Sequence, residues 1–430
     1  MSAAAVSPAR EDSAGPAATK PSRRRTHTIV VGLTVLAAAL ALRYSASMPA
    51  RVDEPYHVKQ IEVFYRGDCR MYVPPGSVYP FLAMLPGYHA VVAAIARLLE
   101  VRTFSELRLI HFGLSLLLLP AAYFTARSAL GREQAWLRAL QCFCCPPIFA
   151  LCFVVYTDVF ALTVPLASLA CCLGGRFTAG GLLGLAGLLV RQTNVVLLAL
   201  TPPVTYFRTE PSARPSPGQF LTRCWAFGLA GLFLFGFLLA NGGRLPLCSP
   251  KFQSVGFFCL NVALSAALGA LLFIPWLTFA APRTTAWIKA APWPALTLTA
   301  AALTTALFAQ VTEDRNRLDL WPELLRNQVL HYATAGLAAR FALGLAAAAM
   351  LLTVAAAGFD RATLAFLALT WLGTTLPLAL VEPRYYLPTF ALLVLLRPPA
   401  SARQELTQWA YFLTLGLALH AIHVHGRYFL

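Results

Sequence analysis

Residues 23–42 read RRRTHTIVVGLTVLAAALAL, a basic cluster followed by a predominantly apolar run. A run of this kind with arginines on one flank is typical of a membrane anchor whose basic end lies in the cytosol. No persuasive signal-peptide cleavage site follows, so we expect residues 27–44 to remain as the first transmembrane helix. The amino terminus is therefore predicted to be cytosolic, with residues 1–26 forming a disordered tail.

The composition of the whole chain repeats this pattern. Of its 430 residues, 58% are hydrophobic and 12% are charged, and apolar stretches recur as far as His420. These values predict an all-α polytopic membrane protein in contact with lipid. The formal net charge of +16 does not indicate a nucleic-acid partner, because basic residues gather in the cytosolic loops of membrane proteins and no soluble segment interleaves basic and aromatic residues.

We expect one transmembrane domain, residues 27–430, with about thirteen crossings. The predicted crossings are residues 27–44, 107–126, 139–156, 158–173, 177–190, 195–206, 220–240, 255–279, 293–309, 334–357, 362–380, 386–396 and 407–424. Residues 80–99, inside the first loop at 45–106, are interrupted by Pro86-Gly87 and flanked by charge, so we expect an interfacial helix there. If that helix spans instead, every later loop changes side.

The predicted loops then sort by chemistry as well as by side. Arginines and a lysine gather on the cytosolic side, as the positive-inside rule requires. Mixed acidic, basic and amide motifs gather on the other side, starting with the acidic pair Asp53-Glu54 in a chain that is poor in acids. Two predicted crossings, 195–206 and 386–396, are short and adjoin such motifs, which is tolerable only where a helix end lines a protein-filled or watered site. We therefore expect one functional site on this side.

The order of these motifs resembles that of a known family, the dolichyl-phosphate-glucose-dependent α-1,2-glucosyltransferases of the endoplasmic reticulum. The resemblance runs from about residue 48 to about residue 390. It departs from the family in a late loop, around Arg326-Asn327 and His331-Tyr332, and after Asn241-Gly242-Gly243, so the chain resembles a divergent member. The motifs are Asp53-Glu54-x-x-His57-x-x-Gln60, Leu85-Pro86-Gly87, Tyr156-Thr157-Asp158, Arg191-Gln192-Thr193-Asn194, Asn241-Gly242-Gly243 and Glu382-x-Arg384-Tyr385-Tyr386.

This resemblance implies a GT-C-type glycosyltransferase in the endoplasmic reticulum membrane with a lumenal active site. Its donor would be dolichyl phosphate glucose and its acceptor the diglucosylated dolichol-linked oligosaccharide. The product would carry the terminal α-1,2-linked glucose of the N-glycan precursor. The oligomeric state is not indicated.

The implied chemistry assigns roles to the motif residues. Displacement at a β-linked glucosyl phosphate with inversion needs a base for the attacking hydroxyl, and Asp53 or Glu54 would supply it, with Asp53 slightly preferred. The leaving lipid phosphate needs cations or donors, for which we expect Arg191, Arg384 and Tyr385. No Asp-x-Asp metal motif is present, so we predict neither metal nor cofactor. Further substrate-binding candidates are His57, Gln60, Asp158, Gln192, Asn194, Asn241 and Glu382.

Several of these residues have structural alternatives. Asp53, Glu54 and Asp158 could each cap a helix, because acids favour the first turn. Glu382 and Arg384 could form an ion pair with no catalytic role. His57, one turn after Asp53, is expected to orient that carboxylate by a hydrogen bond rather than to bind a metal.

Two other functions stay open on the sequence. One is a related transferase that uses a different lipid-linked sugar or acceptor. The other is a transporter or flippase, which would tend to show inverted repeats between its halves. We find no such repeat of the polar motifs, which favours the transferase.

Overall fold

The computed structural model describes residues 20–50, 53–245, 256–308, 310–311, 316–317, 319–320, 324–378 and 380–424. The regular elements of these residues are all helices, which confirms the predicted all-α class. His425 and most of the charged run from Glu313 lie outside the described residues.

The first half of the chain forms twelve of the α-helices that the structure describes, together with two short 3-10 helices. Their bounds are α1 Lys20–Ala46, α2 Glu54–Tyr65, α3 Gly87–Leu98, α4 Phe104–Leu116, α5 Leu118–Leu130, α6 Arg132–Cys144, α7 Pro146–Leu151, α8 Asp158–Leu173, α9 Phe177–Val190, η1 Gln192–Asn194, α10 Val195–Arg208, η2 Pro211–Ala213, α11 Pro217–Arg223 and α12 Trp225–Ala240.

The second half continues in the same way. Its bounds are α13 Cys259–Leu272, α14 Ile274–Ala290, α15 Pro292–Phe308, α16 Leu325–Thr334, α17 Leu337–Ala356, α18 Arg361–Thr375, η5 Pro383–Tyr386, α19 Leu387–Leu396 and α20 Ala402–Val424.

Several helices coincide with predicted crossings, and α8 and α9 do so to the residue. Other predicted crossings are divided into two helices by a break. The stretch 139–156 is divided between α6 and α7 at Pro146-Pro147, because proline lacks the N–H that would continue the first helix. The stretch 255–279 is divided between α13 and α14, which meet at 96° just before Pro275.

Three helical stretches of the described residues are long and apolar enough to cross a membrane, namely 25–46, 104–130 and 337–356. The number rises to five if each of two bent pairs, α11 with α12 and α13 with α14, counts as one span. The remaining predicted crossings fall in shorter helices or, for 407–424, in the 23-residue α20, which is not among these spans. The count of about thirteen therefore stays a prediction.

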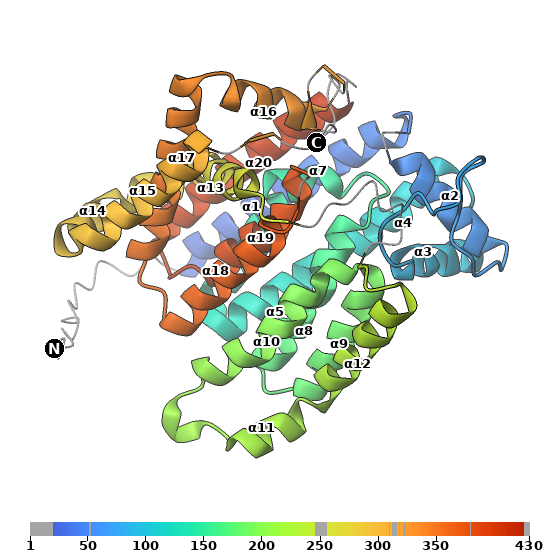
Figure 1. Cartoon of the computed structure of the whole chain (residues 1–430), viewed down its shortest axis with the longest axis horizontal. Helices are drawn as coiled ribbons and strands as arrows, with labels where there is room; N and C mark the ends of the chain where they lie inside the picture. The colour runs from blue at the N-terminus through green and yellow to red at the C-terminus, as the bar shows by residue number, and fades with distance from the viewer. Residues whose placement is uncertain are drawn as a thin grey trace.

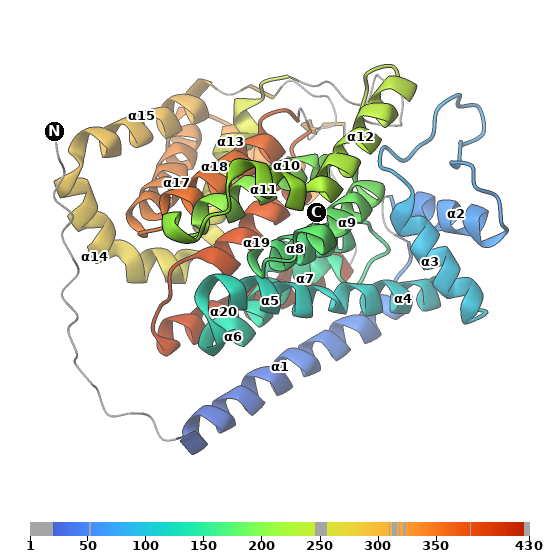
Figure 2. The same ribbon diagram turned by 90° about the horizontal axis from the view of Figure 1, so that it is seen from below.

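The helices pack in two groups joined by α18 and α19 (Figure 1). In the first group α5 packs on α6 and α8, and α9 lies between α8 and α12. In the second, α17 packs on α13 and α15. The ten-residue α19 contacts α5, α6 and α18 and is almost entirely buried, so protein rather than lipid surrounds this short helix. Figure 2 shows α1 along one edge, beside α4, α6 and α20.

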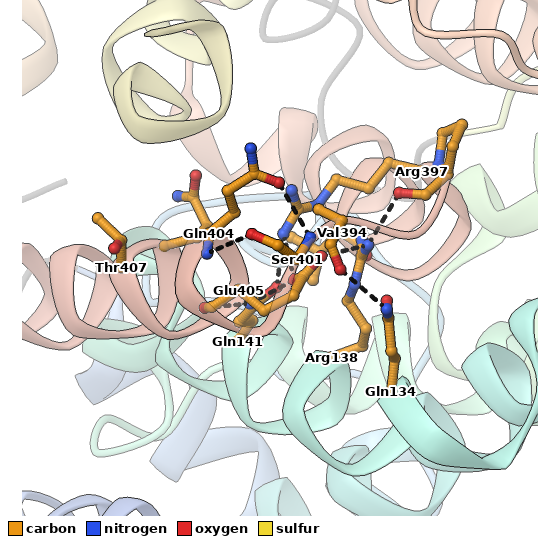
Figure 3. A network of polar contacts seen from close by, with 12 residues as sticks. Gln134, Arg138, Gln141, Val394, Arg397, Ser401, Gln404, Glu405 and Thr407 are labelled. Atoms are coloured by element: carbon orange, nitrogen blue, oxygen red, sulfur yellow. Dashed lines mark hydrogen bonds and ion pairs between the residues drawn. The ribbon is translucent and has the colours of Figure 1, made fainter. Parts of the chain in front are cut away.

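A buried ionic network fastens α20 to α6 and α19 (Figure 3). Glu405 of α20 accepts hydrogen bonds from Arg138 and Arg397, each at 2.7 Å, and from Gln141 at 2.8 Å. We expected Arg138 and Arg397 in cytosolic loops. Arg138 instead lies within α6, Arg397 follows the last residue of α19, and both guanidinium groups are buried. A buried charge of this kind is stable only with its partner, so the network fixes the position of α20.

Candidate active site

The two residues of the acidic pair lie in different environments. The carboxylate of Glu54 is buried and forms a bidentate ion pair with Arg108, at 3.0 Å to Nε and 2.7 Å to Nη2. It also accepts a hydrogen bond from the backbone N–H of Val155 at 2.8 Å. With both oxygens engaged and no exposed surface, Glu54 is a structural ion-pair partner, which corrects its assignment as a candidate base.

Asp53 precedes α2 but its side chain caps no backbone group. Its side chain is 27% exposed, and Oδ2 lies 3.5 Å from Nη2 of Arg384. The surrounding protein raises the pKa of Asp53 above its ordinary 3.8, an effect that Arg384 opposes. The backbone N–H of Asp53 donates to the hydroxyl of Tyr156 at 3.0 Å, which holds the start of α2 against the loop before α8. Asp53 is therefore the member of the pair that is available to a substrate.

Glu382 holds two arginines. Its carboxylate oxygens accept hydrogen bonds from Arg384 in η5 and from Arg326 in α16. Burial alone would raise the pKa of Glu382, but the two guanidinium groups lower it to about 2, so the carboxylate stays charged. The ion pair between Glu382 and Arg384 is thus present, and the role of either residue in catalysis stays a prediction. Through its hydrogen bond with Arg326, Glu382 also connects α16 to the motif residues. Helix α16 belongs to the late loop in which the sequence departs from the family.

Arg191 is paired with Asp158, the first residue of α8. The N-cap position of that helix is Thr157, and the Asp158 carboxylate caps no backbone group: Oδ1 accepts from Arg191 and Oδ2 has no hydrogen-bond partner. The Tyr385 ring lies between two cations, with its centroid 5.6 Å from Cζ of Arg191 and 5.9 Å from Cζ of Arg384. Burial raises the pKa of Tyr385 to about 12, so its hydroxyl stays a neutral donor. Arg191, Arg384 and Tyr385 therefore form one group.

Helix ends explain how these side chains meet. Asp158 begins α8, Arg191 follows the last residue of α9, and the 3-10 turn η5 carries Arg384 just before α19. The first residue of α3, Gly87, approaches this end so closely that a Cβ there would lie 2.6 Å from the carbonyl oxygen of Leu189. Only glycine fits this contact, which accounts for the Leu-Pro-Gly motif and sets α3 against the segment that carries Arg191.

His57 does not orient Asp53 as we expected. Its Nδ1 lies 2.8 Å from Nε2 of His89 in α3, and the two rings stack. Burial and the neighbouring His89 lower the pKa of His57 well below 6.5, so the ring is neutral. We had expected Asp53 as the partner of His57 because the two residues are four positions apart. Helix α3 packs on α2, and its His89 is the partner instead.

Three amide side chains that we predicted to bind substrate form hydrogen bonds with backbone groups in the structure. Gln60 bonds the carbonyl of Arg70 and the N–H of Tyr72, and so fixes the loop after α2. Gln192 donates to the carbonyls of Ala83 and Leu245 and accepts from the N–H of Leu85. The amide nitrogen of Asn194 donates to the carbonyls of Ala161 and Gly187. Buried amides need such partners, and backbone groups supply them here.

Asn241 stands apart from this group. It follows the last residue of α12, and its amide nitrogen donates to the carbonyl of Arg244 at 2.6 Å, closing a local turn. Its role in binding substrate stays a prediction.

Polar atoms without partners mark the cluster. Among the described residues, Nη1 of Arg384, Oδ2 of Asp158 and Nε of Arg326 are buried and make no hydrogen bond. Buried polar groups are nearly always paired, and each unpaired one costs about 1–3 kcal/mol. Two unpaired guanidinium donors and one carboxylate oxygen at one end of the bundle are therefore suited to an anionic, hydroxyl-bearing ligand.

The sequence alone did not single out two buried residues of this region, Arg108 and His89. Tyr156 and Arg326 stood in quoted motifs but were given no role in the site. Arg108 was detectable in principle, since a charged residue inside an apolar helix demands a partner. In the described part of the chain no three His, Cys, Asp or Glu side chains gather as a metal site. Catalysis without metal stays a prediction.

The fold and these groups define a class: an all-helical membrane protein in which carboxylates and arginines from distant motifs meet at one end of the helices. Within this class, residues 49–218 match the sequence model of the DIE2/ALG10 family, which confirms over this segment the resemblance carried by the motifs.

Two curated proteins are similar to parts of the chain. Both are named Dol-P-Glc:Glc(2)Man(9)GlcNAc(2)-PP-Dol alpha-1,2-glucosyltransferase. The Arabidopsis thaliana protein is 30% identical over 157 residues, 34% of this chain and 31% of the relative. The Drosophila melanogaster protein is 25% identical over 186 residues, 42% of this chain and 39% of the relative. The matches thus span less than half of the length of either relative.

The overall structure is similar to two crystal structures of ArnT from Cupriavidus metallidurans. The apo form gives a TM-score of 0.47 at 16% identity, covering 94% of this chain and 78% of ArnT. The form bound to undecaprenyl phosphate gives 0.46 at 15% identity, covering 93% and 78%. Both TM-scores are below 0.5, so this similarity does not by itself establish a shared fold.

Proposed function

We propose that this chain is a GT-C-type α-1,2-glucosyltransferase of the endoplasmic reticulum membrane. It takes glucose from dolichyl phosphate glucose and adds it to the diglucosylated dolichol-linked oligosaccharide, as the terminal α-1,2-linked residue. The family match over residues 49–218 and the names of the two relatives support this substrate pair. In the proposed topology residues 27–430 form one transmembrane domain, residues 45–106 form the first lumenal loop, the tail is cytosolic and the active site is lumenal.

The observation that carries the proposal is the contact between Asp53 and Arg384, at 3.5 Å. Asp53 acts as the base: it takes the proton from the attacking 2-hydroxyl of the acceptor as the new glycosidic bond forms. Its raised pKa makes it a stronger base than an ordinary aspartate, and its exposed fraction of 27% leaves an oxygen accessible.

Arg384 stabilises the leaving group. As the bond between the anomeric carbon and the phosphate oxygen breaks, negative charge grows on the lipid phosphate, and a fixed guanidinium stabilises that charge more than water does. The unpartnered Nη1 of Arg384 is the donor that would bind it. Arg191 and the neutral hydroxyl of Tyr385 complete the phosphate-binding group, while Glu382 and Asp158 hold the two arginines in place.

The reaction that we propose for these groups is a single displacement with inversion. Asp53 would activate the acceptor hydroxyl on one face of the sugar, and the lipid phosphate would leave from the other face. A β-linked donor then gives an α-linked product in one displacement. No side chain needs to form a covalent intermediate, and the chemistry calls for no metal or cofactor.

The proposal is tested by an in vitro transfer assay with dolichyl phosphate glucose and the diglucosylated lipid-linked acceptor. We expect Asp53→Asn to lower kcat by about a hundredfold or more, because general-base catalysis contributes about 10²- to 10⁴-fold, and to leave the melting temperature nearly unchanged. Wild-type turnover in Asp53→Asn would remove Asp53 as the base.

The same assay separates the alternatives. Replacement of the donor by dolichyl phosphate mannose should abolish product, and product formation with mannose but not with glucose would favour a related transferase. A transporter would form no glycosidic product with any donor.

A further inference from the structure

Two adjoining cavities lie far from the candidate active site. One has a volume of about 310 Å³ and the other of about 540 Å³. Gly175, Phe177 and Arg223 line both of them. The walls come from the turn between α8 and α9, the carboxyl end of α10 and the helix α11.

The same helices that build the active site place these cavities at their opposite ends. α8 begins at Asp158 in the site and ends at Leu173 in the cavity wall, and its 16 residues measure about 24 Å. α9 runs back from Phe177 to the residue before Arg191. Figure 1 shows α11 at the lower end of the helices, away from α7 and α16. In the proposed topology this end faces the cytosol.

Arginines line both cavities. Arg208 and Arg223 border the smaller one, and Arg176 and Arg223 the larger. Within the described ranges no ion pair or side-chain hydrogen bond is formed by Arg176 or Arg223, and no Asp or Glu contributes to either wall. Arg208 is the exception among these arginines, because its Nε lies 3.9 Å from Asp360 and its Nη2 donates to the carbonyl of Ala129. Positive-inside topology explains basic residues on this face, but not their convergence on one hollow.

The surroundings suit a lipid. Phe220 packs against Phe177 and Tyr206 to form an aromatic wall. Outside the cavities, Leu221 of α11 and Trp225 of α12 are 69% and 53% exposed. Aromatic and aliphatic side chains beside a cluster of arginines are typical of the boundary between headgroups and acyl chains. A phosphate could lie among the arginines while the attached chains lie along these exposed apolar residues.

We propose that these cavities bind the phosphate group of an anionic phospholipid on the membrane face opposite the candidate active site. The cytosolic leaflet carries such lipids, and each arginine near its surface favours them. The site rests on the topology given under the proposed function but takes no part in the transfer reaction, so a failure of lipid binding and a failure of glucosyl transfer are distinguishable.

The test uses the full chain in detergent with phosphatidylserine or phosphatidylcholine, and native mass spectrometry to count retained lipids. Wild type is expected to retain phosphatidylserine in preference. The double variant Arg176→Gln with Arg223→Gln should lower that retention about thirtyfold, since each of the two arginines contributes on the order of 1 kcal/mol. Inorganic phosphate is added in a second arm. Displacement of the lipid by phosphate alone at comparable concentration would assign the site to a soluble anion and overturn the lipid assignment.

Two further variants make the result specific. Arg361→Gln with Arg403→Gln removes the same charge from exposed positions on the same predicted face, outside both cavities, and should retain lipid like wild type. Ala179→Trp fills the larger cavity without changing charge and should lower retention. Equal retention by the Arg176/Arg223 variant and its Arg361/Arg403 control would refute the site, as would unchanged retention in Ala179→Trp.

Discussion

The carboxylate of Asp53 lies 3.5 Å from Nη2 of Arg384, although 331 positions separate the two residues in the chain. An acid from the first loop and an arginine from the last predicted polar motif thus become neighbours. In the proposed reaction Asp53 takes the proton from the attacking hydroxyl, and Arg384 stabilises the phosphate that leaves.

Arg384→Gln should lower kcat about a hundredfold to a thousandfold, the usual loss when a preorganised donor to a developing anion is removed. Arg384→Lys should recover part of the rate, because it keeps the charge but not the planar fork. The measurement is steady-state transfer with varied donor. Arg70→Gln, at an exposed arginine paired only with Asp68, is the matched control and should behave as wild type. A full rate in Arg384→Gln would exclude it from phosphate binding.

Glu54→Gln should destabilise the fold rather than the transition state. Removal of one partner from a buried ion pair typically costs about 3–5 kcal/mol, since the other charge is left uncompensated. Here that charge is Arg108. Thermal unfolding in detergent provides the readout. Glu62→Gln, on the same helix, breaks only the exposed pair with Lys59 and should cost under about 1 kcal/mol. Equal melting temperatures for the two variants would contradict the structural role of Glu54.

Gly87→Ala should impair transfer from a distance. The new Cβ would meet the carbonyl oxygen of Leu189 at 2.6 Å, which forces α3 away from the segment that carries Arg191. We expect kcat to fall about tenfold or more, because small displacements of catalytic groups are costly. At Gly113 nothing lies within 4 Å of the added methyl, so Gly113→Ala should be neutral or slightly stabilising. The two alanine variants are compared for turnover and melting temperature.

The ion pairs of Glu382 make stability depend on pH. Its pKa is lowered from 4.5 to about 2 in the folded protein, so its stabilising contribution is complete above pH 4.5 and is lost as the pH falls toward 2. We expect the melting temperature to decline across this interval in wild type. Glu382→Gln should melt lower at neutral pH and decline less. Its matched control, Asp68→Asn, removes an exposed carboxylate and should leave the wild-type profile largely intact.

Sequence reasoning was accurate where the determining interactions are local. Hydropathy alone predicted the first and last residues of α8 and α9 correctly. The length of an apolar run and the turn residues at its ends depend only on the local sequence. The same reasoning missed the break at Pro146-Pro147, where a continuous apolar run concealed two helices. The order of the motifs also indicated that distant polar segments share one side.

The roles of individual polar residues required the packed structure. Asp53 and Glu54 are adjacent and chemically equivalent in sequence, yet Arg108 neutralises one and leaves the other available. The sequence suggested ligand-binding amides at Gln60, Gln192 and Asn194, whereas in the structure all three form hydrogen bonds with backbone groups. The sequence by itself determined the helices, their apolar character and the family resemblance, since these depend on neighbours along the chain. Only the tertiary structure decided which polar atoms keep an unmet hydrogen bond, because a buried group's partner comes from whichever distant segment packs against it.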